Sequence, residues 1–163
     1  MQLSFRIKHY FFSAFRELFV HNHSSLEFRA RVFALVISAN EDVNVENYIV
    51  VKKFGMEIYK GDEERANLLM LSTKELVNKV KENSEFSIDT LVLNIQRELK
   101  RVPRYAKKID LDSLNELVSF SHDEDTIAYQ KNIIEFLNTL KEDTLHEKKV
   151  QIIEDEEKIE SKY

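Results

Sequence analysis

The chain of 163 residues contains no cysteine, one proline and two glycines. The lack of cysteine excludes disulfides, thiolate catalysis and zinc sites built on sulfur, and it is compatible with a reducing cytoplasm. Strand-rich folds need glycine and proline turns at short intervals, so their scarcity predicts an all-α fold. The length suffices for one domain with its own core, followed by a tail.

Long apolar runs are also missing. No run approaches the roughly 18 residues that a transmembrane helix requires, and Arg6, Lys8 and His9 interrupt any signal-peptide core. The net charge of −5 argues against nucleic acid as a partner, because neutralising phosphates requires a basic surface. We therefore expect a soluble or peripheral protein of the cytoplasm.

Hydrophobic periodicity predicts a single compact bundle of about seven helices. Gly61 should end the third helix as a C-terminal cap, Ser72 and Thr73 could divide the fourth, and Pro103 should end the fifth. The expected helices cover residues 3–20, 25–39, 45–59 and 62–82, a stretch from Ser84 or Ser87 to Pro103, a stretch from Asp110 or Asp112 to Ser121, and residues 127–140. The helix over 25–39 is apolar nearly all round, which predicts a place at the centre of the bundle.

The first expected helix, residues 3–20, combines an aromatic face with a basic polar face. Phe11, Phe15 and Phe19 lie on the apolar side at helical spacing. A helix of this kind can dock on the core of its own domain, or it can lie at the inner face of a membrane. Both interpretations remain open, and these three side chains are candidate interaction residues.

An acidic loop, residues 39–46, separates the second and third helices, and a similar acidic turn recurs over 122–127. Oxygen-bearing side chains at every second position resemble the start of an EF-hand. Val45 stands where that motif needs glycine and Val51 where it needs glutamate, so a classical EF-hand is excluded. A hard-cation site could still form from both turns, with calcium or manganese held by Asp42, Glu46, Asp123 and Asp125. The alternative is that Asn40, Asn44 and Asp125 cap the helices that follow them.

The two acidic turns belong to two related helix–turn–helix halves. At an offset of 82 positions, Leu35 aligns with Leu117 and Val51 with Ile133. The match preserves inward positions, although two amphipathic hairpins can also align by chance.

One basic run interrupts the acidic second half of the chain. It consists of Arg97, Lys100, Arg101, Arg104, Lys107 and Lys108. These side chains could meet an acidic partner, phosphate groups or the acidic tail of the same chain, or they could form a solvated face. Arg97, Arg101 and Arg104 are the candidate interaction residues among them.

The charged tail, residues 142–163, has a different character. Leu145, Ile152 and Ile159 stand seven apart, but Lys149 and Glu156 occupy the positions four further on, which disfavours a two-stranded coiled coil. We expect a solvated, frayed helix that serves as a tether or as an arm for a partner.

Catalytic constellations are weak. His122 and Asp123 could form an acid–base couple of a hydrolase, but no nucleophile or oxyanion donor accompanies them. The chain has no glycine-rich phosphate loop. We therefore expect no enzyme and no required cofactor.

Two segments resemble the tellurite-resistance TerB-like family, whose signature is an apolar helix ending in Ala-Asp-Gly-x-Val/Ile with a Glu opening the next helix. Residues 36–43 with Glu46, and residues 117–124 with Ile127, stand in these places, and the resemblance covers about 25–141. It implies a seven-helix domain over 1–141, acidic loops that bind divalent metal, and a role in stress-response or membrane-associated assemblies. Asn40 replaces the signature Asp, and Glu41 and Glu124 replace the Gly.

The sequence thus predicts a non-enzymatic helical interaction or scaffold module with an unidentified protein partner. The alternative is a regulatory module that binds a divalent cation through the paired acidic loops.

Overall fold

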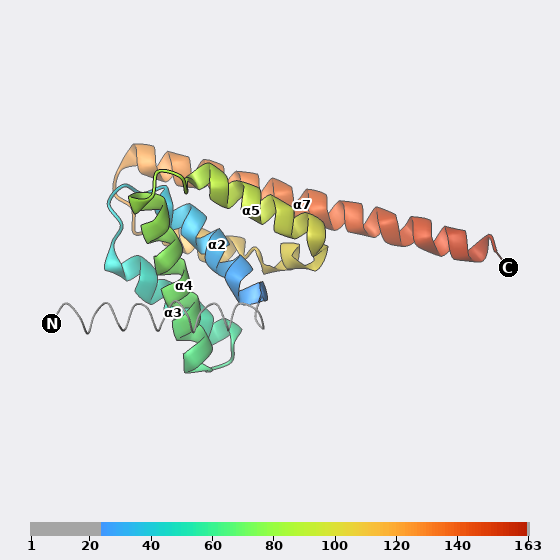
Figure 1. Ribbon diagram of the computed structural model, residues 1–163, viewed down its shortest axis with the longest axis horizontal. Helices are drawn as coiled ribbons and strands as arrows, with labels where there is room; N and C mark the ends of the chain where they lie inside the picture. The colour runs from blue at the N-terminus through green and yellow to red at the C-terminus, as the bar shows by residue number, and fades with distance from the viewer. Residues whose placement is uncertain (1–23, 163) are drawn as a thin grey trace.

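The computed structural model of the protein describes residues 24–162. These residues form six α-helices and one 3-10 helix, without a strand among them, so the predicted all-α bundle is confirmed (Figure 1). The elements are α2 (Ser24–Ser38), α3 (Val45–Ile58), α4 (Glu63–Glu82), α5 (Ile88–Arg101), η1 (Pro103–Lys108), α6 (Leu111–Val118) and α7 (Glu124–Glu160). The expected helix over 3–20, with Phe11, Phe15 and Phe19, lies outside the described residues.

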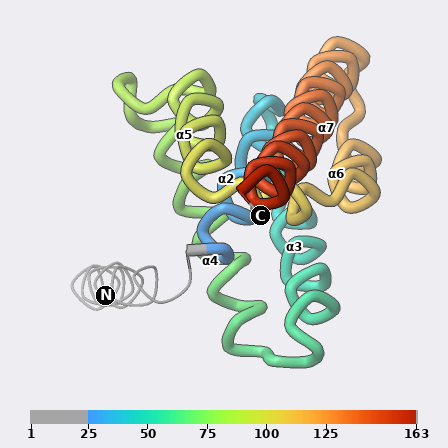
Figure 2. The backbone as a smooth tube through the Cα atoms, turned by 90° about the vertical axis from the view of Figure 1, so that its right-hand side faces the viewer, coloured from blue at the N-terminus to red at the C-terminus, as the bar shows by residue number. Residues whose placement is uncertain are grey.

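Helix α2 is the centre of the bundle, as its apolar sequence predicts. Every residue from Val32 to Asn40 is buried. The helix contacts α4, α5, η1, α6 and α7, which surround it in Figure 2. A helix with neighbours on all sides needs apolar residues all round, which explains why α2 has no polar stripe.

Helices α3 and α4 form a tight antiparallel hairpin. Gly61 has a φ of +85° and its N–H donates to the main-chain oxygen of Met56 at 2.8 Å, so it ends α3 in the left-handed conformation that glycine favours. Gly55 permits the close approach of the two helices, because a Cβ atom there would lie 2.8 Å from the Cα of Ala66. The expected helix end at Gly61 is confirmed.

Helix α4 is not divided. Ser72 and Thr73 are both fully buried inside a continuous helix, and the Thr73 hydroxyl donates to the main-chain oxygen of Leu69 at 2.7 Å. The expectation of a break was wrong because a hydroxyl in mid-helix can bond the carbonyl of the preceding turn instead of capping a new one.

Helix α5 begins with a capping box. Ser87 and Thr90 exchange side-chain to main-chain hydrogen bonds at its first turn. Pro103 ends the α-helical path and opens the short helix η1, which periodicity did not predict. Inside the bundle, Glu98 of α5 forms an ion pair with Arg31 of α2.

Helix α7 is one continuous element of 37 residues, about 55 Å long at 1.5 Å per residue. The expected end near residue 140 was wrong, because the helix continues without a break into the tail, which was expected to be a separate frayed helix, as far as Glu160. Its last three turns, residues 149–160, are exposed at every position and project beyond the other helices, as Figure 1 shows. We call residues 149–160 the arm and the remaining described residues the body.

The two helix–turn–helix units are α2–α3 and α6–α7. Leu35 and Leu117 are both fully buried, and Val51 and Ile133 are both in the core. Phe54 is buried whereas its counterpart Phe136 is 39% exposed, so the second unit presents a different face to solvent.

None of the helices within residues 24–162 is both long enough and apolar enough to cross a lipid bilayer.

Candidate functional site

The acidic turns that precede α3 and α7 supply the N-caps of these helices. The main-chain N–H of Glu46 donates to the Asn44 side chain at 3.2 Å. Asp123 accepts from both the main-chain N–H and the hydroxyl of Thr126, at 2.9 and 3.0 Å. Asn44 thus caps α3 as expected, but Asp123 rather than Asp125 caps α7.

The remaining predicted acids lie at the same two helix ends. Glu46 stands in the first turn of α3 and Asp125 in the first turn of α7, where a carboxylate meets the positive end of the helix dipole. Asp42 is exposed, and its main-chain N–H donates to the Asn40 side chain at 3.0 Å. His122 is also exposed, next to the carboxylate of Asp123 that already serves as a cap.

The two turns meet in the interior through side chains that the sequence did not single out as partners. The Asn40 amide donates to the Ser121 hydroxyl at 3.3 Å, and this hydroxyl donates to the Gln130 side chain at 2.8 Å. The Gln130 amide then donates to the main-chain oxygen of Val36 at 3.0 Å. All three side chains are buried, so this chain of bonds fixes the turns against one another.

A lysine ammonium closes the end of α2. Lys81 Nζ donates to the main-chain oxygens of Ser38 at 3.1 Å and Asn40 at 2.8 Å. The Ser38 carbonyl is at the negative end of the helix dipole, which a cation stabilises, and the Asn40 carbonyl belongs to the turn that follows. The positive charge beside this turn is therefore supplied by the protein itself.

In residues 24–162, no three His, Asp or Glu side chains gather as the ligands of a metal ion would. Asp42, Glu46, Asp123 and Asp125 lie on two turns that touch through Asn40, but their carboxylates do not form such a group. Calcium or manganese binding stays a prediction from the sequence.

A basic face lies at the end of α5 and on η1. Arg97, Lys100 and Arg101 are exposed on α5, and the exposed Arg104 on η1 holds its guanidinium 5.4 Å from the ring centre of Tyr105. We call these four cations the basic face. No ion pair within residues 24–162 joins any of them to an acid of α7.

The neighbouring Lys108 of η1 is partly buried. Burial, together with the positive charges of Arg29 and Arg104, lowers the pKa of Lys108. Arg29 and Arg104 therefore add positive charge beside Lys108 at this end of the body, which favours the approach of negative charge.

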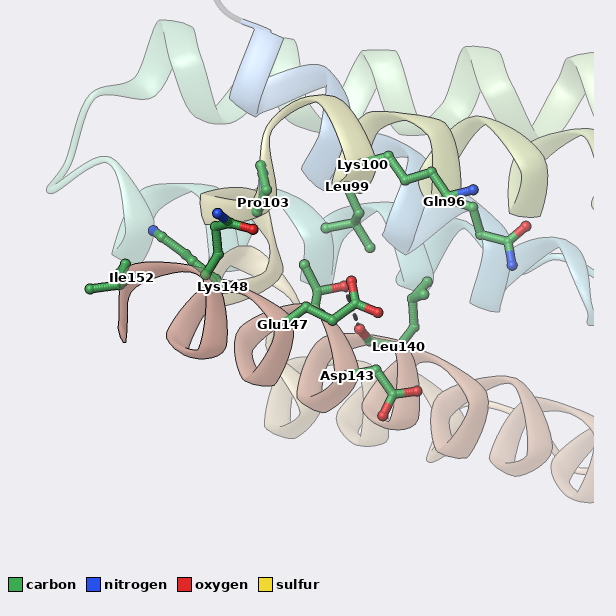
Figure 3. Close-up of a pocket in the computed structure, with 11 residues that line it drawn as sticks. Gln96, Leu99, Lys100, Pro103, Leu140, Asp143, Glu147, Lys148 and Ile152 are labelled. Carbon is green, nitrogen blue, oxygen red and sulfur yellow. Dashed lines mark hydrogen bonds between the residues drawn. The ribbon is translucent and has the colours of Figure 1, made fainter. Parts of the chain in front are cut away.

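An open groove of about 540 Å³ separates α5 and η1 from α7. Figure 3 shows Gln96, Leu99 and Lys100 on one side, Leu140 and Glu147 on the other, with Pro103 and Ile152 at the end where the arm leaves the body. The walls mix apolar side chains with both signs of charge. The complete lining is Gln96, Leu99, Lys100, Pro103, Leu140, Asp143, Thr144, Glu147, Lys148, Gln151 and Ile152.

The arm continues one wall of this groove into solvent. Val150, Ile152, Ile153 and Ile159 expose 40%, 48%, 55% and 61% of their surfaces. Its last two turns are acidic, with Glu154, Asp155, Glu156, Glu157 and Glu160 against Lys158. An isolated helix as short as the arm is only marginally stable in water. Its exposed isoleucines make it still less favourable for the arm to remain uncovered.

Sequence reasoning found part of this surface. The charged composition of residues 142–163 predicted a solvated helix that serves as a tether or as an arm, and the run from Arg97 to Arg104 indicated a basic face. It missed the groove, because η1 and the continuation of α7 past residue 140 create it. Leu145 packs on the core, so the heptad pattern is divided between body and arm.

Comparison with protein-family models, with curated proteins and with solved structures finds no match to the chain. The described residues define its class as an all-α bundle from which one long helix projects.

Proposed function

We propose that the protein is a non-enzymatic helical interaction module that serves as a scaffold in a cytoplasmic assembly. The observation that carries the proposal is the arm, which exposes Ile152, Ile153 and Ile159 next to an open groove. Large apolar side chains that are exposed together beside a groove are typical of protein-binding sites. The resemblance to the TerB-like family supports the same role and suggests a stress-response assembly.

Affinity capture from cells that express the protein tests this function. Ile152→Glu with Ile153→Glu places charge on the arm without touching the core, and we expect it to lose proteins that the unchanged chain retains. Val45→Glu with Ile49→Glu is the matched control, because these α3 side chains are 70% and 60% exposed in another part of the body. Identical sets of captured proteins for all three chains would contradict the proposal.

The sequence over residues 3–20 suggests that the assembly forms at the inner face of a membrane. Flotation of the full chain with vesicles of anionic lipid tests this contact, and Phe11→Ser, Phe15→Ser and Phe19→Ser together should abolish it. If neither chain floats with the vesicles, the membrane contact is refuted and the protein interaction is unaffected.

The alternative function is a regulatory module that responds to a divalent cation. Its support is that the acidic turns before α3 and α7 lie together through Asn40 and Ser121. Calorimetric titration of calcium and of manganese into chelator-treated protein tests it. Heat that disappears in Asp42→Asn with Asp125→Asn would support this alternative, and the absence of heat at millimolar ion would refute it.

A further inference from the structure

The arm and the basic face carry opposite charges in the same molecule, yet they do not meet. Helix α7 is straight and continuous, so the acidic end of the arm points away from the body (Figure 1). The basic face lies back on α5 and η1, beside the base of the arm, where Lys100 and Lys148 line one groove. In this geometry the acidic end of the arm does not reach the basic face of its own chain.

We propose that a second copy of this chain occupies the surface, with the two α7 helices antiparallel and each arm lying along the other chain's groove and basic face. This proposal rests on the proposed function and names the partner of that same surface. A two-fold axis makes each contact occur twice, since one surface patch then meets its own copy in the other chain.

Charge decides the direction of the pairing. In an antiparallel pair, the acidic residues 154–160 of one arm approach Lys148, Lys149 and the basic face of the other chain. In a parallel pair, acidic end would meet acidic end and Lys149 would meet Lys149, and both contacts are repulsive. Lys149 and Glu156, which disfavour a regular two-stranded coiled coil, have opposite charges, so their repulsion is avoided when the two helices run antiparallel.

Burial of apolar side chains supplies the attraction between the two chains, and the charges set the direction in which they pair. Ile152 lies both in the lining of the groove and on the exposed surface of the arm, so it joins the arm to the groove in which Leu99 and Leu140 are the other large apolar side chains. Ile152 and Ile159 stand seven positions apart and share one side of α7, so covering that side with a second arm removes both from water.

Sedimentation equilibrium of the full chain tests the pairing, and we expect a species of twice 19.3 kDa. Glu154→Lys, Glu156→Lys and Glu157→Lys together form the arm reversal, and Arg97→Glu, Arg101→Glu and Arg104→Glu together form the face reversal. Each should raise the dissociation constant about tenfold or more. Reversal of three exposed acids of the body, Glu57→Lys, Glu64→Lys and Glu135→Lys, should leave the constant within about twofold.

Mixing the two reversed chains is the decisive measurement. The arm-reversed chain has a positive arm and a positive face, and the face-reversed chain has both negative, so each repels itself. Both contacts become attractive in the mixed pair, and we expect a heterodimer about as tight as the unchanged dimer. Circular dichroism of each variant confirms that the helices are retained.

The proposed pairing would be overturned if the unchanged chain stayed monomeric at all concentrations. It would also be overturned if the two reversed chains did not combine. If the chain is monomeric but the Ile152→Glu, Ile153→Glu chain loses captured proteins, the partner is a different protein and the proposed function stands. If the chain is monomeric and the captured set is unchanged, both proposals fail.

Discussion

The side-chain amide of Gln130 donates a hydrogen bond of 3.0 Å to the main-chain oxygen of Val36, 94 positions earlier in the chain. Val36 lies in the last turn of α2, whose carbonyls have no partner within the helix. Gln130 of α7 and Lys81 of α4 together satisfy this end, so two distant helices complete the central one.

Replacing Gln130 with Leu should lower the free energy of unfolding by about 2 kcal/mol, because the Val36 carbonyl and the Ser121 hydroxyl would lose their buried partner. Urea unfolding followed by circular dichroism measures the change. Asn132→Leu is the matched control on the same helix, since Asn132 is exposed and lies outside the groove, and its effect should stay within about 0.5 kcal/mol. Equal losses would contradict the assigned role.

The ion pair between Arg31 and Glu98 predicts a larger loss. Glu98→Ala leaves the Arg31 side chain, which is 23% exposed, without its carboxylate, and we expect a loss of about 2–4 kcal/mol. Glu116→Ala breaks the exposed pair with Lys53 and should cost at most about 1 kcal/mol. Urea unfolding of the two variants and of the unchanged chain measures both losses. A loss for Glu98→Ala no larger than that for Glu116→Ala would contradict a structural role of the Arg31–Glu98 pair.

Gly55→Ala should destabilise the protein by about 1–3 kcal/mol despite the better helix propensity of alanine. The new methyl group would meet the main chain of Ala66 at 2.8 Å, which a rotamer change cannot relieve. Gly61→Ala offers a contrast, because it has open space but a φ of +85°, and should cost about 1 kcal/mol. A rise in melting temperature for Gly55→Ala would show that α3 and α4 approach less closely.

Asp123 can be tested as a cap separately from its charge. Asp123→Ala removes the acceptor for Thr126 and should cost about 1 kcal/mol, whereas Asp123→Asn keeps an acceptor and should cost less than about 0.5 kcal/mol. Thermal unfolding measures both. If Asp123 instead bound a cation, added calcium would stabilise the unchanged chain and would stabilise neither variant.

The raised pKa of Tyr48 predicts that the protein loses stability at high pH. Burial raises the pKa of Tyr48 from 10.0 to about 12, so the folded protein keeps the phenol proton that the unfolded chain releases. The contribution is fully present below about pH 10 and is lost as the pH rises toward 12. Urea midpoints should therefore fall less steeply over this range in Tyr48→Phe than in the unchanged chain. Parallel curves would contradict the assignment.

Local rules predicted most of the helices. The spacing of apolar residues placed α2 at the centre, Gly61 ended α3, and Ser87 and Asp110 were among the expected caps. These signals act within one or two turns, so they are readable wherever the neighbours along the chain decide the conformation.

The errors arose where two local interpretations were equally good. Ser72 could cap a new helix or lie buried within an old one, and the packing of α4 against α2 selected the second. Charged residues after 140 were compatible with fraying, but α7 continues through them as a helix. Propensity alone does not distinguish these outcomes, because tertiary contacts outweigh it.

By itself, the sequence determined the helical class, the central helix, most helix ends and the opposite charges of the basic face and the arm. Only the tertiary structure decided that Asn40 meets Ser121, that Gln130 and Lys81 complete α2, and that η1 and α7 enclose a groove. The physical reason is the distance along the sequence over which each kind of interaction acts. Periodicity and capping depend on residues a few positions apart, whereas these contacts join positions 41 to 94 residues apart and exist only once the helices have packed.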